Sequence, residues 1–270
     1  MNYLERAPSP HLVDYVKCYW SIEDPGTFAG EPEAIVPDGC FEIIFDLADR
    51  FKRLSFGEGE KLQPITIVAG QLRRSILIQP TGRIKLFGTR FQPAGAFPFF
   101  DFSLSELTDS TEEIDSIWGT EGRELEDRIC EARTFDARVA IIEIALTRRL
   151  LAKERANTSA IAAAGMIVKA VGGVSIRSVA QAVGVSERTL EREFKSKIGV
   201  SPKLFARIIR FQTLLKAVES DDSTSLLDHA LDLGYFDQAH MTNEFREFAG
   251  KSPTAYTADA HRMSDAFTGT

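Results

Sequence analysis

The stretch GYFDQAHMTNEFREFAGKSPTAY, residues Gly234 to Tyr256, contains the residues that end one helix and begin another. Gly250 suits the left-handed conformation that follows a helix end, Ser252 suits the cap of the next helix, and Pro253 suits its first turn. The ring of Tyr256 is placed to bury that turn. The same arrangement occurs 51 residues earlier, at Gly199, Ser201, Pro202 and Phe205. The chain therefore builds one helix joint twice.

The repeat continues into the helix that precedes each joint. At the same offset, Leu190 matches Met241 and Phe194 matches Phe245. Further upstream, each copy has an alanine four residues before a glycine, and small side chains at these positions let two helices cross closely. Similarity at a fixed offset indicates a repeated supersecondary unit. We therefore expect two helix-turn-helix units in an all-α C-terminal part.

The second helix of the first unit begins after Ser186, which can cap it, just as Ser175 can cap the helix before it. At 100° per residue, the arc opposite its apolar stripe carries Arg188, Glu191, Arg192 and Lys195. Charged residues are common on surface helices, so this arc alone also fits a solvated face. The duplication favours DNA, because a helix that presents arginines in a major groove can pair them with guanine edges.

The segment from Pro202 to Glu219 joins the two units. Its pattern predicts a helix of about 18 residues, or about 27 Å at a rise of ~1.5 Å per residue. Successive major grooves on one face of DNA lie roughly 34 Å apart. A rod of this length can place two recognition helices in successive grooves.

Residues 157 to 260 closely resemble the DNA-binding domain of AraC-type transcriptional regulators. The resemblance rests on the long spaced pattern ALDLGYFDQAHMTNEFREFAGKSPTAY, which begins at Ala230. It implies seven helices, two helix-turn-helix units, sequence-specific binding to promoter or operator DNA, and RNA polymerase as a candidate partner. By position it implies that the bases are faced by Arg188, Glu191 and Arg192 in the first unit, and by Gln238, Ala239, Thr242 and Asn243 in the second.

Charge is distributed unevenly between the two units. The whole chain has a net charge of -7 and a pI near 5.3, which argues mildly against nucleic acid. From Glu187 to Lys216, however, eight basic residues stand against three acidic ones, whereas from Glu219 to Glu247 eight acidic residues stand against one basic. Relatives commonly have a basic residue where Asn243 stands. We therefore expect the first unit to supply most of the phosphate contacts.

Short apolar runs fill the chain up to about Pro93: CYWSI, AIVPDGCFEIIFDL, ITIVAG, SILIQP and RIKLFGTRF. Their β-branched and aromatic residues, placed between turn signals, predict strands in a β-rich sheet or small barrel. Residues 1–156 are expected to form a β-rich domain that ends in helices, and residues 157–270 the all-α DNA-binding domain. The small, polar segment from Asn157 to Ala164 marks the boundary. The fold class is α+β with two domains.

The front half is also similar, more weakly, to sensory domains of some AraC-type regulators. The similarity lies in YW at Tyr19, PDGCFEIIF at Pro37 and GTRFQPAGAFPFF at Gly88. It implies effector sensing or dimerisation, and many such domains are cupin-like barrels. The metal-binding version of that barrel needs clustered histidines. His11 is the only histidine before His229, so neither a metal nor another cofactor is expected.

A helix is expected over residues 135 to 151, where apolar residues recur at spacings of three and four: Phe135, Val139, Ile142, Leu146 and Leu150. Ile141, Ile144 and Leu151 widen its apolar face, which either packs on its own domain or contacts a second subunit. Because the helix leads into the C-terminal half, it is the expected route of communication between the halves.

Three groups in the front half admit two interpretations each. Cys40, between Asp38 and Glu42, has the chemistry of a nucleophile, but a turn followed by a buried cysteine is favoured because no histidine is near it in sequence. Trp20 and the cluster of Phe97, Phe99 and Phe100 suit either a ligand pocket or, as we favour, core packing. Cys18, Cys40 and Cys130 are odd in number and widely spaced, which suits free thiols in a reducing compartment.

These observations predict a cytoplasmic, sequence-specific transcription regulator that is not an enzyme. No membrane span is expected, because no segment approaches the ~20 apolar residues that a span requires. Candidate partners are operator DNA, a small organic effector and a second copy of the chain. The competing hypothesis is an enzyme or a thiol-modification switch in the front half, joined to an accessory DNA-binding module.

Overall fold

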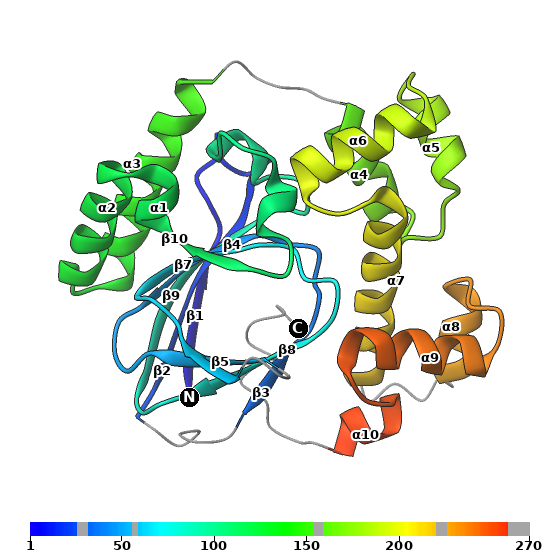
Figure 1. The fold of residues 1–270 in the computed structure, drawn as a ribbon, viewed down its shortest axis with the longest axis horizontal. Coiled ribbons are helices and arrows are strands. Elements are labelled where there is room, and N and C mark those ends of the chain that lie inside the picture. Colours follow the sequence, from blue (N-terminus) through cyan, green and yellow to red (C-terminus); the bar gives the residue numbers. More distant parts are fainter. Residues whose placement is uncertain (26–31, 56–58, 154–158, 220–225, 259–270) are drawn as a thin grey trace.

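The computed structural model describes residues 1–25, 32–55, 59–153, 159–219 and 226–258. Figure 1 shows a front half of strands and helices α1 to α3, which lies beside a C-terminal half made of helices. No helix in the described ranges is long and apolar enough to cross a bilayer. The predicted α+β class with two parts is confirmed.

The described strands of the front half form two antiparallel sheets. The larger sheet has the order β1-β2-β9-β4-β7-β10, and the smaller has the order β3-β8-β5-β6. The larger sheet consists of β1 Asn2–Arg6, β2 Val16–Asp24, β9 Ile84–Phe91, β4 Glu42–Asp46, β7 Thr66–Ala69 and β10 Thr111–Glu113. The smaller sheet consists of β3 Glu33–Ile35, β8 Ile76–Pro80, β5 Phe51–Ser55 and β6 Gly59–Leu62. These strands thus form two sheets and not one closed barrel.

The apolar run from Ala34 to Leu47 is divided between the two sheets. Its start lies in β3 of the smaller sheet and its end in β4 of the larger one. The turn signal Pro37-Asp38-Gly39 lies in the crossing between the sheets, where Gly39 has a φ of 79°. Strands β1 and β6 were not predicted from the sequence. Their side chains are largely exposed, and such strands lack an alternating apolar pattern.

Alternating side chains give strand β4 two different faces. Ile43 and Phe45 point into a core beneath the helices of the front half. Glu42, Ile44 and Asp46 point to the opposite face, which looks toward the smaller sheet. The larger sheet therefore separates an apolar core from a second, more polar space.

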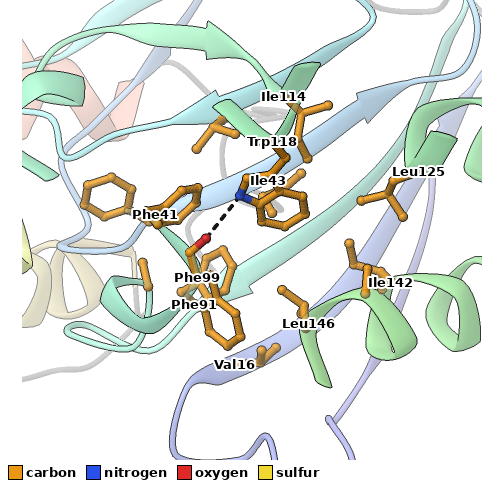
Figure 2. Close-up of a cluster of buried hydrophobic side chains, with 14 of the residues drawn as sticks. Val16, Phe41, Ile43, Phe91, Phe99, Ile114, Trp118, Leu125, Ile142 and Leu146 are labelled. Atoms are coloured by element: carbon orange, nitrogen blue, oxygen red, sulfur yellow. Dashed lines mark hydrogen bonds between the residues drawn. The ribbon is translucent and has the colours of Figure 1, made fainter. Parts of the chain in front are cut away.

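Helices and short 3-10 turns cover the first of these faces. They are η1 Phe97–Phe99, η2 Leu104–Leu107, α1 Ile114–Trp118, α2 Thr120–Glu131 and α3 Phe135–Leu151. Figure 2 shows the resulting core, in which Trp118 Nε1 donates a hydrogen bond to the backbone oxygen of Phe99 at 3.1 Å. Phe99 and Phe100 are at most 1% exposed in this core and Phe97 packs against it, whereas Trp20, at 0% exposed, lies in the separate cluster on the other face of the sheet. The interpretation of these rings as core residues is confirmed.

Helix α3 packs on its own domain through Val139, Ile142 and Leu146. Ile144 and Leu151 lie on its outer side, where they are 51% and 81% exposed. The wide apolar face expected from the sequence is therefore only partly buried. The link from α3 to the C-terminal half, residues 154–158, lies outside the described residues, and so does the predicted boundary between residues 156 and 157.

The described C-terminal half consists of seven helices, as the resemblance implied. They are α4 Ser159–Lys169, α5 Ile176–Ala182, α6 Glu187–Ile198, α7 Pro202–Glu219, α8 Leu226–Asp232, α9 Gln238–Ala249 and α10 Pro253–Ala258. Helix α7 has the predicted bounds and runs from the group α4–α6 to the group α8–α10 (Figure 1). Within the segment expected as a polar boundary, residues 159–164 form the start of α4, where Ala160, Ala163 and Ala164 are buried in the core that α4 shares with α6 and α7.

The structure confirms the repeated joint. Gly199 and Gly250 follow their helices in the left-handed conformation, with φ of 93° and 76°. Ser201 Oγ and Ser252 Oγ each accept a hydrogen bond from a backbone amide in the first turn of the next helix, at 3.2 and 3.3 Å. Apolar residues of α7 enter the cores of both units. One continuous helix therefore joins the two units.

Candidate nucleic-acid interface

The first helix-turn-helix unit consists of α5 and α6. Its turn is closed by a 3.0 Å hydrogen bond from the amide of Val185 to the carbonyl of Ala180, and Gly184 has a φ of 73°. Ser186 Oγ caps α6 by accepting a hydrogen bond from the amide of Thr189 at 3.1 Å. Ser175 occupies the cap position of α5, but its side chain makes no capping hydrogen bond.

The outward face of α6 is the predicted one. Leu190, Phe194 and Ile198 are at most 1% exposed and fix the opposite face in the core. The predicted DNA-contacting residues of this helix are all exposed: Arg188, Glu191, Arg192 and Lys195. Lys195 Nζ lies 3.6 Å from Glu191 Oε1 across one helical turn, a surface ion pair that is weak enough to be exchanged for a phosphate.

The second unit, formed by α8 and α9, repeats this geometry. The amide of Tyr235 donates to the carbonyl of Ala230 at 3.0 Å, and Gly234 has a φ of 82°. Asp237 caps α9 by accepting a hydrogen bond from the amide of His240 at 2.7 Å. On its outward face, Gln238, Ala239 and Asn243 are exposed and Thr242 is half-buried.

Helix α9 is held on α7 by an ion-pair cluster centred on the buried Glu244. Glu244 is 4% exposed and accepts hydrogen bonds from Arg207 Nε at 2.7 Å and Arg210 Nη2 at 2.8 Å. Arg207 also pairs with Glu247. Burial by itself raises the pKa of Glu244, but the hydrogen bonds from the two arginines outweigh it and hold that pKa below its ordinary value.

This cluster corrects the charge count drawn from the sequence. Arg207 and Arg210 belong to the basic segment, and Glu244 and Glu247 belong to the acidic one, yet buried Glu244 pairs with both arginines and the more exposed Glu247 pairs with Arg207. Two of the eight basic residues and two of the eight acidic ones are therefore not available to DNA. The difference in net charge between the two units is therefore smaller than the count from the sequence indicates.

A further cation on α9 follows from the repeat. Since α6 begins at Glu187 and α9 at Gln238, the offset of 51 residues places Arg246 where Lys195 lies on α6. Arg246 is exposed, on the same side of α9 as Ala239 and Asn243. The sequence contained this signal, because the offset that matched the joints also matches these two cations.

Phe236 is a second residue that sequence reasoning did not assign to the surface. It lies in the turn before α9 and is 85% exposed, and its amide donates to His240 Nδ1 at 3.2 Å. An aromatic ring beside the first turn of a recognition helix can make apolar contacts with DNA, for example with a thymine methyl group.

The front half contacts both helix joints. Thr108 Oγ1 donates a hydrogen bond to the carbonyl of Gly199 at 2.6 Å, and a Cβ at Gly199 would lie 3.2 Å from the backbone oxygen of Leu104. At the other joint, the amide of Ser75 donates to the carbonyl of Phe248 at 3.0 Å, and Ser75 Oγ lies next to Gly250. The 3-10 turn η2 with Thr108 makes the first of these contacts and the loop before β8 makes the second, so neither follows the route through α3 that the sequence favoured.

A third contact lies in the middle of α7. Gln212 Nε2 donates a hydrogen bond to the carbonyl of Pro37 at 2.7 Å in a buried environment. Val36 belongs to the apolar core of the second unit, and a Cβ at Gly39 would touch Ile209 and Phe205 of α7. We name residues 36–40 the docking loop. This loop connects β3 of the smaller sheet to β4 of the larger one and packs against the side of the DNA-binding module.

The described residues include no group of three or more His, Cys, Asp or Glu side chains that could hold a metal ion.

Asp38 Oδ1 accepts a hydrogen bond from the amide of Cys40 at 2.9 Å, which is the geometry of the turn that the sequence favoured over a nucleophile. Cys40 is buried, and burial raises the pKa of its thiol.

Two family models match separate parts of the chain. Residues 179–259 match a helix-turn-helix domain, and residues 4–113 match a domain of unknown function (DUF6597). No curated protein sequence matches the chain closely enough to count as a relative.

Among solved structures, ToxT from Vibrio cholerae is similar to 89% of this chain over 98% of its own length, with a TM-score of 0.50 and 8% identity. A second ToxT structure, bound to (E)-4-(8-methylnaphthalen-1-yl)but-3-enoic acid, has the same coverage with a TM-score of 0.51 and 9% identity. At such identity the likeness concerns the fold.

Two equivalent exposed recognition helices on one connecting helix define a paired helix-turn-helix module attached to a β-rich domain. The match of residues 179–259 identifies that module as a helix-turn-helix domain.

Proposed function

We propose that this chain is a transcription regulator of the AraC type and that it reads operator DNA through the outward faces of α6 and α9. The observation that supports the proposal is a pair of equivalent exposed faces on units that share α7 in both cores. Contacts to bases are assigned to Arg188, Glu191, Arg192, Gln238, Ala239, Thr242 and Asn243, and a contact to phosphate is assigned to Lys195. Residues 1–156 form the controlling domain, and residues 157–270 form the DNA-binding domain.

Arg188 and Arg192 are the strongest candidates for base readout. Both are exposed on α6, and within the described part of the chain neither has an ion-pair partner. Their guanidinium groups are thus free to donate two hydrogen bonds to the O6 and N7 atoms of guanine. The face of α9 offers shorter, neutral side chains at the corresponding positions, so we assign it the smaller share of the affinity.

The test is quantitative footprinting on an operator selected from random DNA. Arg188→Ala and Arg192→Ala should each cost ~1–3 kcal/mol and relax discrimination at particular base pairs. Arg133→Ala removes the same charge from an exposed position between α2 and α3 and should leave binding unchanged. Wild-type affinity for both α6 variants would show that the assignment is wrong.

We infer that the front half controls the module and does not catalyse a reaction. The contacts at both joints and at the docking loop support this inference. An effector must bind the two states of the protein with different affinity, and the coupling free energy is typically ~1–3 kcal/mol and reciprocal. That a ToxT structure of the same fold contains an organic acid supports a small organic molecule as the effector.

The outer face of α3 is our proposed contact for a second copy of the chain. Ile144 and Leu151 give it exposed apolar area. Sedimentation of wild type and of Ile144→Asp, with Leu231→Asp on α8 as the control, should show a dimer that only the α3 change weakens. A monomer at every concentration would contradict this contact.

The cytoplasm, where operator DNA and RNA polymerase are present, is the proposed compartment.

The competing thiol-switch hypothesis is disfavoured by the surroundings of the cysteines. Burial raises the pKa of Cys18 to about 12 and also raises the pKa of Cys40 and Cys130. A thiol reacts through its thiolate, so these shifts lower reactivity near neutral pH. A thiol reagent should therefore label Cys18 and Cys40 only after unfolding. Rapid labelling of the native protein, with a change in DNA affinity, would favour the switch.

A further inference from the structure

A cavity lies between the two sheets of the front half, on the face of the larger sheet that looks away from its helices. It measures about 100 Å³. Engineered apolar cavities of ~150 Å³ hold a benzene molecule, so the space suits one ring or a short alkyl chain. Strands of both sheets supply its apolar lining, which includes Ile35, Ile44, Phe51, Ile67, Ile76 and Leu86.

Two carboxylates mark the end of the cavity next to the docking loop. Asp38 and Glu42 both line the space. Glu42 Oε1 accepts hydrogen bonds from Arg90 Nε at 2.7 Å and from Trp20 Nε1 at 3.1 Å, and Asp38 Oδ2 lies 3.8 Å from the same Arg90 nitrogen. Arg90 is 1% exposed and lies behind the lining, not within it. One buried cation is therefore shared by two carboxylates.

Asp46 supplies a third carboxylate farther along β4. Glu42, Ile44 and Asp46 alternate along that strand and share the cavity face. Asp46 is 8% exposed. Its Oδ2 accepts a hydrogen bond from the amide of Phe51 at 3.2 Å, whereas its Oδ1 is buried without a partner among the described residues. A buried acceptor without a donor costs free energy, and a ligand that donates a hydrogen bond would remove that cost.

The chemistry of the lining selects the ligand. Three carboxylates against one cation repel an anion and attract a hydrogen-bond donor or a cation in a space of low polarity. The apolar walls require a hydrophobic body of limited size. Building on the proposed effector control, we propose that the cavity binds a small apolar primary amine, whose ammonium group contacts Asp38 and Glu42. This polarity is opposite to that of the organic acid in the ToxT structure.

The site is placed to affect the DNA-binding module. Val36, Asp38 and Cys40 line the cavity and belong to the docking loop, which is hydrogen-bonded to α7 through the carbonyl of Pro37. An ammonium group on Asp38 weakens the pull of Arg90 on that carboxylate and so changes the position of the loop. The change reaches α7 without a long relay, because Gly39 is packed directly on Ile209 and Phe205.

Ligand-observed NMR and calorimetry on the full chain test the assignment. The probes are hexylamine and 2-phenylethylamine, compared with the alcohols and carboxylates of similar shape, hexan-1-ol, 2-phenylethanol, hexanoate and phenylacetate. Both amines should bind at least about tenfold more tightly than the alcohols, and the carboxylates should not bind. Preferential binding of the carboxylates, or no binding of either amine at millimolar concentration, would overturn the proposal.

Three variants locate the amine. Asp38→Asn keeps the acceptor for the amide of Cys40 while removing the charge, and it should weaken amine binding about tenfold. Asp14→Asn removes the same charge from an exposed position outside the cavity and should have no effect. Ile44→Phe fills the space without changing charge and should abolish binding. Unchanged amine affinity in both Asp38→Asn and Ile44→Phe would place the amine elsewhere and refute the site.

Operator affinity measured with and without the amine separates this proposal from the proposed function. Amine binding that is lost in Ile44→Phe but leaves DNA affinity unchanged would establish the site and refute effector control through it. Amine binding that shifts DNA affinity, with the shift lost in Asp38→Asn, supports both. Intact DNA binding without amine binding would refute only the ligand.

Discussion

Single residues decide how the second recognition helix meets DNA. Arg246 is the counterpart of Lys195 at the repeat offset, and both are exposed. Each phosphate contact contributes ~0.9 to the slope of log affinity against log salt, so Lys195→Ala and Arg246→Ala should each lower that slope by about one. Arg133→Ala serves as the control. A slope that Arg246→Ala leaves unchanged would mean that the end of α9 does not reach the backbone.

Asn243 gives a gain-of-function test of the same helix. It occupies the position of Arg192 on α6 and is exposed. Asn243→Arg should therefore tighten binding, most strongly at low salt, because it adds a cation to a face with few charges. The measurement is operator affinity over a range of salt concentrations. No change in affinity, on a footprint that covers two grooves, would contradict the smaller share assigned to α9.

Asp46 predicts a pH-dependent effect on stability. Burial raises its pKa to about 6, so the folded protein holds the proton more tightly than the unfolded chain does. The ionised carboxylate is therefore destabilising above pH 6, and the penalty disappears below the unfolded pKa near 4. Asp46→Asn should raise the free energy of unfolding at pH 7.5 by on the order of 2 kcal/mol, and by little at pH 4. Urea unfolding checks this, and an equal effect at both pH values would contradict it.

At the scale of helices, the Glu244 cluster attaches α9 to α7. Glu244→Gln leaves two partly buried arginines without their shared carboxylate, and breaking such a pair costs about 3 kcal/mol or more. The lowered pKa of Glu244 means that its contribution is complete above the ordinary glutamate pKa and is lost as the pH falls through the folded value. The variant should thus differ from wild type at neutral pH and converge with it in acid. A neutral-pH difference within error would refute the attachment.

The two left-handed glycines of the first unit form a matched pair. Gly184 has open space where a Cβ would stand, whereas a Cβ at Gly199 would meet Leu104, Gln71 and Phe41 of the front half at 3.2 to 3.4 Å. Both alanine substitutions carry the left-handed strain of roughly 1–2 kcal/mol. Gly199→Ala should lower stability further, because the front half must also shift. If thermal unfolding shows the same loss of stability for both variants, the joint at Gly199 is not packed tightly against the front half.

The sequence predicted the elements whose cause is local. The joints at Gly199 and Gly250, the cap at Ser186 and the bounds of α7 follow from residues within one or two turns of each other. The pairing of Glu244 with Arg207 and Arg210 did not follow, because the partners lie on different helices and their charges were counted in different segments. The split of Ala34–Leu47 between two sheets also needed tertiary information, since an apolar run does not specify which sheet it joins.

At the scale of the molecule, the docking loop makes the two halves depend on each other. Gln212→Ala leaves the buried carbonyl of Pro37 without its donor, which should lower the free energy of unfolding by about 1–3 kcal/mol. Hydrogen exchange should increase in the docking loop and in α7 together. Thr213→Ala, which removes a hydrogen bond within α7 alone, is the control. Increased exchange confined to α7 would argue against coupling through the loop.

The passage of α7 through both cores has a consequence for the arrangement of the operator. Helix α7 is packed at both ends, and the front half contacts both joints. The rotation and the distance between the two recognition helices, α6 and α9, are therefore both fixed. One inserted base pair rotates the second half-site by about 34° around the DNA axis, and five place it on the far side of the duplex. A rigid DNA-binding domain cannot turn one recognition helix relative to the other to match this rotation. Binding should therefore fall with each inserted base pair, and a full-turn insertion of about ten should not restore it within one protein molecule.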